Sequence, residues 1–239
     1  MQARVPVMLW AHWLTAPARC RTRWSGSRAR QFFQPAALEF SEKICILSIT
    51  NTQEDKQSMK LMIASDIHGS AYYAKKLAAA FRAEQPDKLL LMGDLLYHGP
   101  RNALPQEYDC MAVAEQLNAL KEQIVAVRGN CDAEIDQMVL QFPMMADYAL
   151  LEVNGLRLYA THGHLWCEDN PPPMAEGTVL INGHFHVPAC RPHEDFLYIN
   201  PGSTSIPKEG SVGSYLMLEG QTFTWKDMDG QAYQTHTVK

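Results

Sequence analysis

The chain has 239 residues, of which 46% are hydrophobic and 20% charged, and its formal net charge is −5 at pH 7. This length suits one domain with an appendage, and the apolar content is enough for a sizeable core. No apolar run is long enough to cross a membrane, and the main body lacks the clustered Lys/Arg stripe of dedicated nucleic-acid binders. The six cysteines are scattered without a C-x-x-C pair, which indicates free thiols in a reducing compartment, so we expect a cytoplasmic protein.

The first 58 residues differ in composition from the rest of the chain. Residues 1–35 contain six arginines, three tryptophans and no acidic residue. Three interpretations are open: a secretory signal, an organellar transit peptide, or a mis-assigned start codon. We favour the third, because Gln53-Glu54-Asp55 can be encoded by a bacterial ribosome-binding sequence shortly before Met59. The expected organisation is an Arg-rich leader over residues 1–58, disordered or not part of the natural protein, and one domain over residues 59–239.

The first half of this domain alternates between strand and helix patterns. Short apolar runs at residues 60–65, 88–93 and 124–130 predict buried strands. Residues 70–85 and 109–123 carry apolar side chains at helical spacing, and each segment opens on a residue suited to cap a helix, Ser or Asp. Near-continuous apolar strands that alternate with helices predict a parallel βαβ sheet.

The second half is mostly β. Residues 148–163 predict two strands joined at Asn154-Gly155, the strongest short hairpin signal. Four further short strands are predicted at residues 178–183, 196–200, 214–220 and 222–228. Gly and Pro separate these segments, so we expect a second sheet packed against the first.

Metal-binding side chains follow five of the predicted strands. They are Asp66 and His68, Asp94, Asn130, His162, and the pair His184 and His186. Each residue alone is more often a turn, a cap or a surface side chain than a ligand. Together they are informative, because the carboxyl ends of strands in an α/β sheet are where ligands bind. We therefore expect the seven side chains to converge on one pocket.

The number and chemistry of these ligands favour two metal ions. Seven ligands are too many for one tetrahedral zinc, whereas two metals that share a bridging carboxylate would use all of them. Imidazole and oxygen ligands without thiolate favour Mn, Fe, Co, Ni or Zn. Two divalent cations against two carboxylates leave a positive site, which suits an anionic phosphate ester. Two metals about 3.5–4 Å apart lower the pKa of a bound water and clamp an in-line displacement.

Five short blocks resemble the signatures of a known family when taken in order. "SDIHG", "GDLLYHG", "RGNCD", "THGH" and "GHFH" are similar to the motifs of the calcineurin-like metallophosphoesterases, and most similar to the small YfcE-type phosphodiesterases. The resemblance runs from Met59 to about the C-terminus. It implies an α/β fold, a metallophosphoesterase-type β-sandwich of two mixed sheets flanked by helices.

The resemblance also implies a role for each ligand. Asp66, His68 and His186 would hold one metal with Asp94, which would bridge. Asn130, His162 and His184 would hold the second metal. Manganese is the expected ion, with zinc, nickel, cobalt or iron as substitutes. Asp94, Asn130 and His162 are the expected catalytic residues, and a metal-bound hydroxide would attack phosphorus.

Three further residues are candidate substrate contacts. His98 and Arg101 lie in the loop after the bridging carboxylate, where Arg101 suits a bidentate contact with phosphate. Cys131 stands where many members of the superfamily have histidine, and the small bacterial branch has cysteine there too. A structural role for each of the three is the alternative.

We expect a metal-dependent phosphoesterase that hydrolyses phosphodiester bonds in a small substrate. A phosphomonoesterase is the nearest alternative, because pocket shape decides which ester fits. A non-catalytic scaffold of the same fold, as in a eukaryotic retromer subunit, is opposed by the complete ligand set, and the order of the blocks opposes an amidohydrolase. Neither a membrane nor a nucleic-acid partner is expected, and homo-oligomer formation is left open.

Overall fold

The computed structural model describes residues 44–47 and 58–238. Chain contacts divide the protein into two units, Met1–Phe40 and Ser41–Lys239. The leader predicted over residues 1–58 lies outside the described residues except for Ser58 and one strand, β1 (Ile44–Leu47), which pairs in parallel with β5 (Tyr148–Val153). None of the described helices is long and apolar enough to span a membrane.

The first sheet contains the predicted parallel unit. Its strand order is β12-β11-β10-β2-β3-β4, and β2 (Lys60–Ala64), β3 (Lys88–Leu91) and β4 (Ile124–Ala126) run in parallel. The antiparallel strands β10 (Ser214–Glu219) and β11 (Thr222–Asp227) extend it beyond β2. Strand β4 is shorter than predicted, because the chain leaves the sheet after Ala126 to form the loop that carries Asn130.

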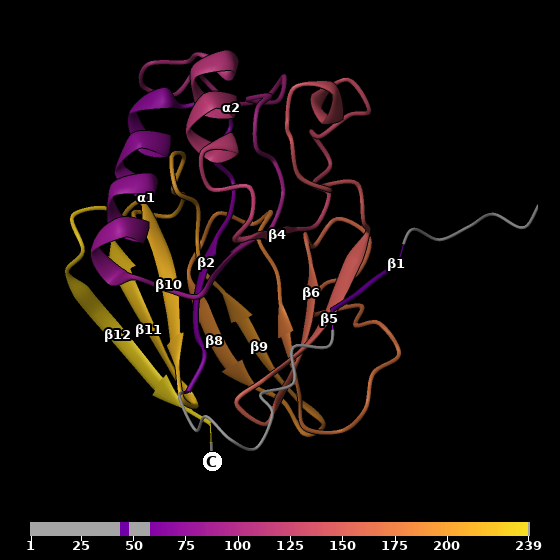
Figure 1. Cartoon of the computed structure of the whole chain (residues 1–239). Coiled ribbons are helices and arrows are strands. Elements are labelled where there is room, and N and C mark those ends of the chain that lie inside the picture. The colour runs from indigo at the N-terminus through magenta and orange to yellow at the C-terminus, as the bar shows by residue number, and fades with distance from the viewer. Residues whose placement is uncertain (1–43, 48–57, 239) are drawn as a thin grey trace, which may run out of the picture. The chain divides into compact units, whose positions relative to one another are not determined.

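Two helices cover one face of this sheet (Figure 1). Helix α1 (Ala71–Glu84) begins after Ser70, whose side chain accepts a hydrogen bond from the Tyr73 N–H, and α2 (Cys110–Asn118) begins after Asp109, which caps Ala112 in the same way. Both caps are those predicted. They satisfy N–H groups that the first turn of a helix leaves free.

The second sheet has the strand order β1-β5-β6-β7-β9-β8. Strands β5 and β6 (Leu156–Thr161) form the predicted hairpin, in which Asn154 and Gly155 both have positive φ, at 54° and 80°. Both residues of a tight hairpin turn need this conformation, and Asn and Gly adopt it at low cost. Strands β7 (Thr178–Ile181) and β9 (Phe196–Asn200) continue the sheet in parallel.

The core lies between and beside the two sheets. Successive residues of β2 face opposite sides: Met62 and Ala64 pack with the helices, whereas Leu61 and Ile63 pack against the second sheet. All four are buried, which explains the uninterrupted apolar run in the sequence. The predicted β-sandwich of two mixed sheets with helices is therefore confirmed.

Four elements were not predicted. They are β1, β8 (Ala189–Pro192), β12 (Ala232–Thr237) and a short 3-10 turn over Asp136–Met138. Strand β12 is exposed at five of its six positions, so it carries no alternation of apolar and polar side chains. It forms because its backbone pairs with β11.

Candidate metal centre

The seven predicted ligands all lie in loops that follow strands. Asp66 and His68 follow β2, Asp94 follows β3, and Asn130 follows β4. His162 follows β6, and His184 with His186 follows β7. The strands β2, β3 and β4 are parallel, as are β6 and β7, so within each sheet their carboxyl ends point the same way. The two sheets face each other, and the two sets of loops meet.

Five of these residues have an unusual backbone conformation. They are Asp66, His68, Asp94, His184 and His186, with φ values of 57°, 50°, 55°, 63° and 62°. A non-glycine residue in this region costs on the order of 1–3 kcal/mol and persists only where its surroundings enforce it. The remaining positive-φ residues of the described chain that are not glycine number four, and one of them is the hairpin residue Asn154. Backbone strain is therefore concentrated at this site.

Asp66 is the most deeply anchored of the seven. Its backbone carbonyl accepts hydrogen bonds from the hydroxyl groups of Ser203 and Ser205, at 2.9 and 3.1 Å. Its carboxylate Oδ2 accepts from the Ser65 hydroxyl at 2.6 Å and from the His184 N–H at 3.1 Å. The other oxygen, Oδ1, is buried and has no hydrogen-bond partner. Asp66 thus presents one uncommitted oxygen to the site.

Three of the histidines are held with the same nitrogen facing inward. Their Nδ1 atoms each donate to a backbone carbonyl: His68 to Tyr97 at 2.8 Å, His162 to Met92 at 2.6 Å, and His186 to Ile206 at 2.6 Å. A carbonyl only accepts hydrogen bonds, so the proton of each neutral ring sits on Nδ1 and Nε2 carries the lone pair. This is the arrangement that backbone groups impose on metal-binding histidines.

The inward-facing atoms gather around Asp66 and Asp94. Asp66 Oδ1 lies 3.3 Å from His186 Nε2 and 3.6 Å from His68 Nε2. Asp94 Oδ2 lies 3.7 Å from His68 Nε2 and 3.5 Å from His162 Nε2. Asp94 therefore lies between the two halves of the predicted ligand set.

Asn130 and His184 complete the second half. Asn130 Oδ1 lies 3.2 Å from His162 Nε2, and the His184 ring lies 5.1 Å from the His162 ring, centroid to centroid. All seven side chains thus meet at one place.

The chemistry of this cluster fits divalent cations. Potential ligand atoms of Asp66, His68 and His186 lie within 4.8 Å of one another, and so do those of Asp66, Asp94 and His162. Lone pairs and carboxylates that face each other in a buried space repel unless a cation or a proton lies between them. Burial by itself would lower the pKa of His162, but the hydrogen bond and charge of Asp94 raise it to about 9. The site therefore demands positive charge, which metal ions supply.

One important residue was not identified from the sequence. Asp132 is buried, and its carboxylate accepts three backbone N–H groups, those of Asp94 at 2.8 Å, Leu95 at 2.9 Å and Gly129 at 2.7 Å. Burial and the charge of Asp94 raise the pKa of Asp132 to about 6. Asp132 thus holds together the loops that carry Asp94 and Asn130. The only signal was its place in the "RGNCD" block.

The cluster opens into a cavity of about 450 Å³, which is lined by polar side chains. Of the predicted substrate contacts, Arg101 and Cys131 line this cavity. His98 is not among the lining residues, and its ring instead lies against the rings of Tyr97 and Tyr108. Two of the three predicted contact residues therefore line the cavity.

Cys131 is a neutral thiol in this environment. Its backbone N–H donates to Asp94 Oδ1 at 2.8 Å, and its Sγ accepts from the Asn130 amide at 3.2 Å. Burial and the charge of Asp94 raise the pKa of Cys131 to about 12. The thiolate is the nucleophilic form of cysteine, and this environment disfavours it.

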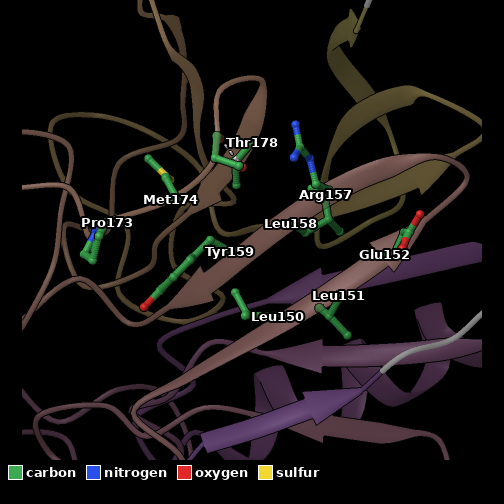
Figure 2. A pocket seen from close by; sticks show the side chains of 10 residues that line it. Leu150, Leu151, Glu152, Arg157, Leu158, Tyr159, Pro173, Met174 and Thr178 are labelled. Carbon is green, nitrogen blue, oxygen red and sulfur yellow. Dashed lines mark hydrogen bonds between the residues drawn. The ribbon is translucent and has the colours of Figure 1, made fainter.

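A second cavity, of about 390 Å³, lies on β5 and β6 away from the ligand cluster (Figure 2). Leu150, Leu158, Pro173 and Met174 supply much of its apolar lining. None of the seven predicted ligands lines it. The polar cavity over Asp94 is accordingly the candidate site.

Comparisons with known proteins agree with this geometry. The family model described as the calcineurin-like phosphoesterase superfamily domain matches residues 59–222. Phosphodiesterase YfcE of Escherichia coli K12 is 44% identical over 166 residues, which make up 70% of this chain and 90% of that protein. The structure of Yfce, a phosphoesterase from E. coli, matches with a TM-score of 0.73 at 40% identity, over 76% of this chain and 100% of that chain.

A more distant structure shares the fold alone. A single mutant of Vps29 from Entamoeba histolytica matches with a TM-score of 0.52 at 14% identity, over 76% of this chain and 100% of that chain. The family assignment rests on the first two relatives and on the matched domain. This chain is a member of the calcineurin-like phosphoesterase superfamily.

Proposed function

We propose that this phosphoesterase hydrolyses phosphodiesters at a centre of two divalent metal ions. Asp66, His68 and His186 would hold one ion, and Asn130, His162 and His184 the other, with Asp94 as the bridge. The observation that carries the proposal is the position of Asp94 Oδ2, at 3.7 Å from His68 Nε2 and 3.5 Å from His162 Nε2.

The bound ions would lower the pKa of a water molecule and neutralise charge on the phosphate oxygens. The protein would supply the positioning. Asn130 lines the cavity beside the bridge, where its amide can donate to a phosphate oxygen as negative charge develops. Arg101 lines the same cavity and its guanidinium suits a phosphate oxygen pair. His98 is not among the residues that line the cavity, so it would contact only a substrate that extends beyond them.

The ligand set suggests manganese. Oxygen and imidazole ligands without a thiolate suit Mn²⁺, with Zn²⁺, Ni²⁺, Co²⁺ or Fe²⁺ as substitutes. The E. coli relative is named a phosphodiesterase, which favours a diester over a monoester as the substrate. We further propose a small phosphate ester as the partner. We also propose a cytoplasmic location, because Cys110, Cys131, Cys167 and Cys190 are free thiols. Assembly into a homo-oligomer is compatible with this function.

The test is to replace Asp94, the proposed bridging ligand. The Asp94→Asn variant should lose hydrolysis of bis(p-nitrophenyl) phosphate and should retain less than the two metal ions per chain expected for the parent, as measured by elemental analysis. Asp169→Asn is the matched control, because Asp169 is exposed and lies outside the cavity. Parental turnover by Asp94→Asn would refute the bridging role. Faster turnover of p-nitrophenyl phosphate than of the diester by the parent would favour the monoesterase alternative.

A further inference from the structure

Two positive side chains at the candidate site have no acidic partner. Among the lysines and arginines of the described chain, only Arg82, Arg101 and Lys208 make no side-chain hydrogen bond or ion pair. Arg82 is in the last turn of α1, where positive charge is favourable in any case. Arg101 and Lys208 both line the polar cavity over the metal ligands. Free positive charge at this cavity is therefore a feature of the site.

Lys208 is tied to a metal ligand through its backbone. Its N–H donates to the carbonyl of His186 at 3.1 Å, and the Ser211 hydroxyl lies 3.4 Å from the same carbonyl. The ring of His186 donates in turn to the carbonyl of Ile206 at 2.6 Å. The segment from Ile206 to Ser211 is thus fastened to His186 at three points, which sets where the lysine side chain starts.

The turn that carries Lys208 is also well defined. The Ser211 N–H donates to the carbonyl of Lys208 at 3.0 Å, and the two residues between them, Glu209 and Gly210, have φ values of 54° and 74°. Positive φ at both central positions is typical of a tight type I′ turn. Lys208 is exposed at the first position of this turn and lines the cavity. The backbone of Lys208 is therefore fixed beside the cavity that a substrate would occupy.

The charge of the site exceeds what a simple diester carries. The two divalent ions are balanced by the carboxylates of Asp66, Asp94 and the buried Asp132 together with the expected metal-bound hydroxide. Arg101 adds one positive charge, which is suited to the phosphate of a diester. The single charge of a phosphodiester then leaves Lys208 unpaired. Phe185, with 43% of its surface exposed, lines the same cavity and offers an apolar surface to the organic part of a substrate.

We propose that Lys208 binds a second anionic group, so that the preferred substrates are phosphodiesters in which one alcohol carries its own phosphate or carboxylate. This inference rests on the proposed function, because it assigns a role beside the same metal centre. Lys208 is here a specificity-determining residue, and it takes no part in bond cleavage.

The test compares two chromogenic diesters that differ by one anionic group. They are the p-nitrophenyl ester of thymidine 5′-phosphate and the same compound with an added 3′-phosphate. The Lys208→Gln variant should raise the KM of the substrate with two anionic groups roughly tenfold, since loss of one charge-assisted contact is worth about that factor, and should leave its kcat unchanged. It should leave the KM of the singly anionic substrate within about twofold. Lys208→Arg should restore the preference, and added salt should weaken it.

Arg82→Gln is the matched control, because it removes an unpaired positive charge outside the cavity. Equal effects of Lys208→Gln on both substrates, no effect on either, or the same effect from Arg82→Gln would overturn the inference. Loss of bound metal in Lys208→Gln would do so too, because the lysine would then act through His186. If the parent hydrolyses neither diester, the proposed function fails and this inference fails with it.

Discussion

The hydrogen bonds of Asp132 lead to a prediction about a residue that supports the candidate metal centre without being a predicted ligand. Asp132 Oδ2 accepts the N–H groups of Asp94 and Gly129, and Oδ1 accepts that of Leu95. In the Asp132→Asn variant only one side-chain oxygen remains, so the amide group faces at least one backbone N–H. A buried donor left without a partner costs about 1–3 kcal/mol, and a neutral acceptor binds the others less strongly. We expect a loss of about 2–4 kcal/mol in the free energy of unfolding.

The same substitution should weaken metal binding, although Asp132 is not a predicted ligand. Asp94 has a φ of 55°, and its backbone N–H is held by Asp132. Removing such support typically costs a factor of about 10–100 in metal affinity or activity. Urea unfolding of the metal-free protein measures the first effect, and calorimetric titration with Mn²⁺ measures the second.

Asp109→Asn is the control for the chemical change. Asp109 caps α2 by accepting the Ala112 N–H at 3.0 Å, and Asn caps a helix about as well as Asp. This variant should therefore unfold and bind metal like the parent. If Asp132→Asn also matched the parent in both assays, the three hydrogen bonds would not be what holds Asp94 in place.

Three further predictions follow from other contacts. In Gly183→Ala the new Cβ would lie 1.9 Å from Ser65 Oγ and 2.9 Å from Asp66 Oδ2. We expect this overpacking to lower the free energy of unfolding in urea by about 1–3 kcal/mol and to weaken metal binding. An unchanged unfolding free energy and unchanged metal affinity would contradict the close approach. Glu84 is largely buried beside Lys226 and Lys60; burial alone would raise its pKa, but the hydrogen bond and charge of Lys226 lower it. Because the pKa of Glu84 is lower in the folded than in the unfolded protein, its charge stabilises the fold at pH values above the unfolded pKa of about 4.3. This stabilisation is lost as the pH falls through the pKa of the folded protein. Glu84→Gln should therefore cost about 1 kcal/mol at pH 7 and progressively less in acid, whereas a deficit that is constant with pH would show that the charge is not involved. Removal of metal by a chelator should lower the melting temperature. Mn²⁺ at a hundredfold excess over its dissociation constant should restore about 2.7 kcal/mol of the free energy of unfolding. An unchanged melting temperature would argue against a site that binds metal in the folded state.

The sequence by itself determined much of this protein. Continuous apolar runs predicted β2 and β3, Ser70 and Asp109 marked the helix starts, and Asn154-Gly155 marked the hairpin. These features depend on near neighbours in the chain, and local preference is enough to identify them. The kinds of residue that follow each strand, together with their order in five short blocks, also indicated the family.

The tertiary structure decided the features that depend on contacts with backbone groups. Strand β12 has no apolar pattern and exists through its pairing with β11. The Asp132 side chain accepts hydrogen bonds from N–H groups on the loop after β3, about 38 residues away along the chain. Lys208 lies near the site because its turn is tied to His186. In each case the deciding contact involves a backbone amide, and a backbone amide is the same chemical group at every position except proline, so no pattern of side chains announces which amides will take part.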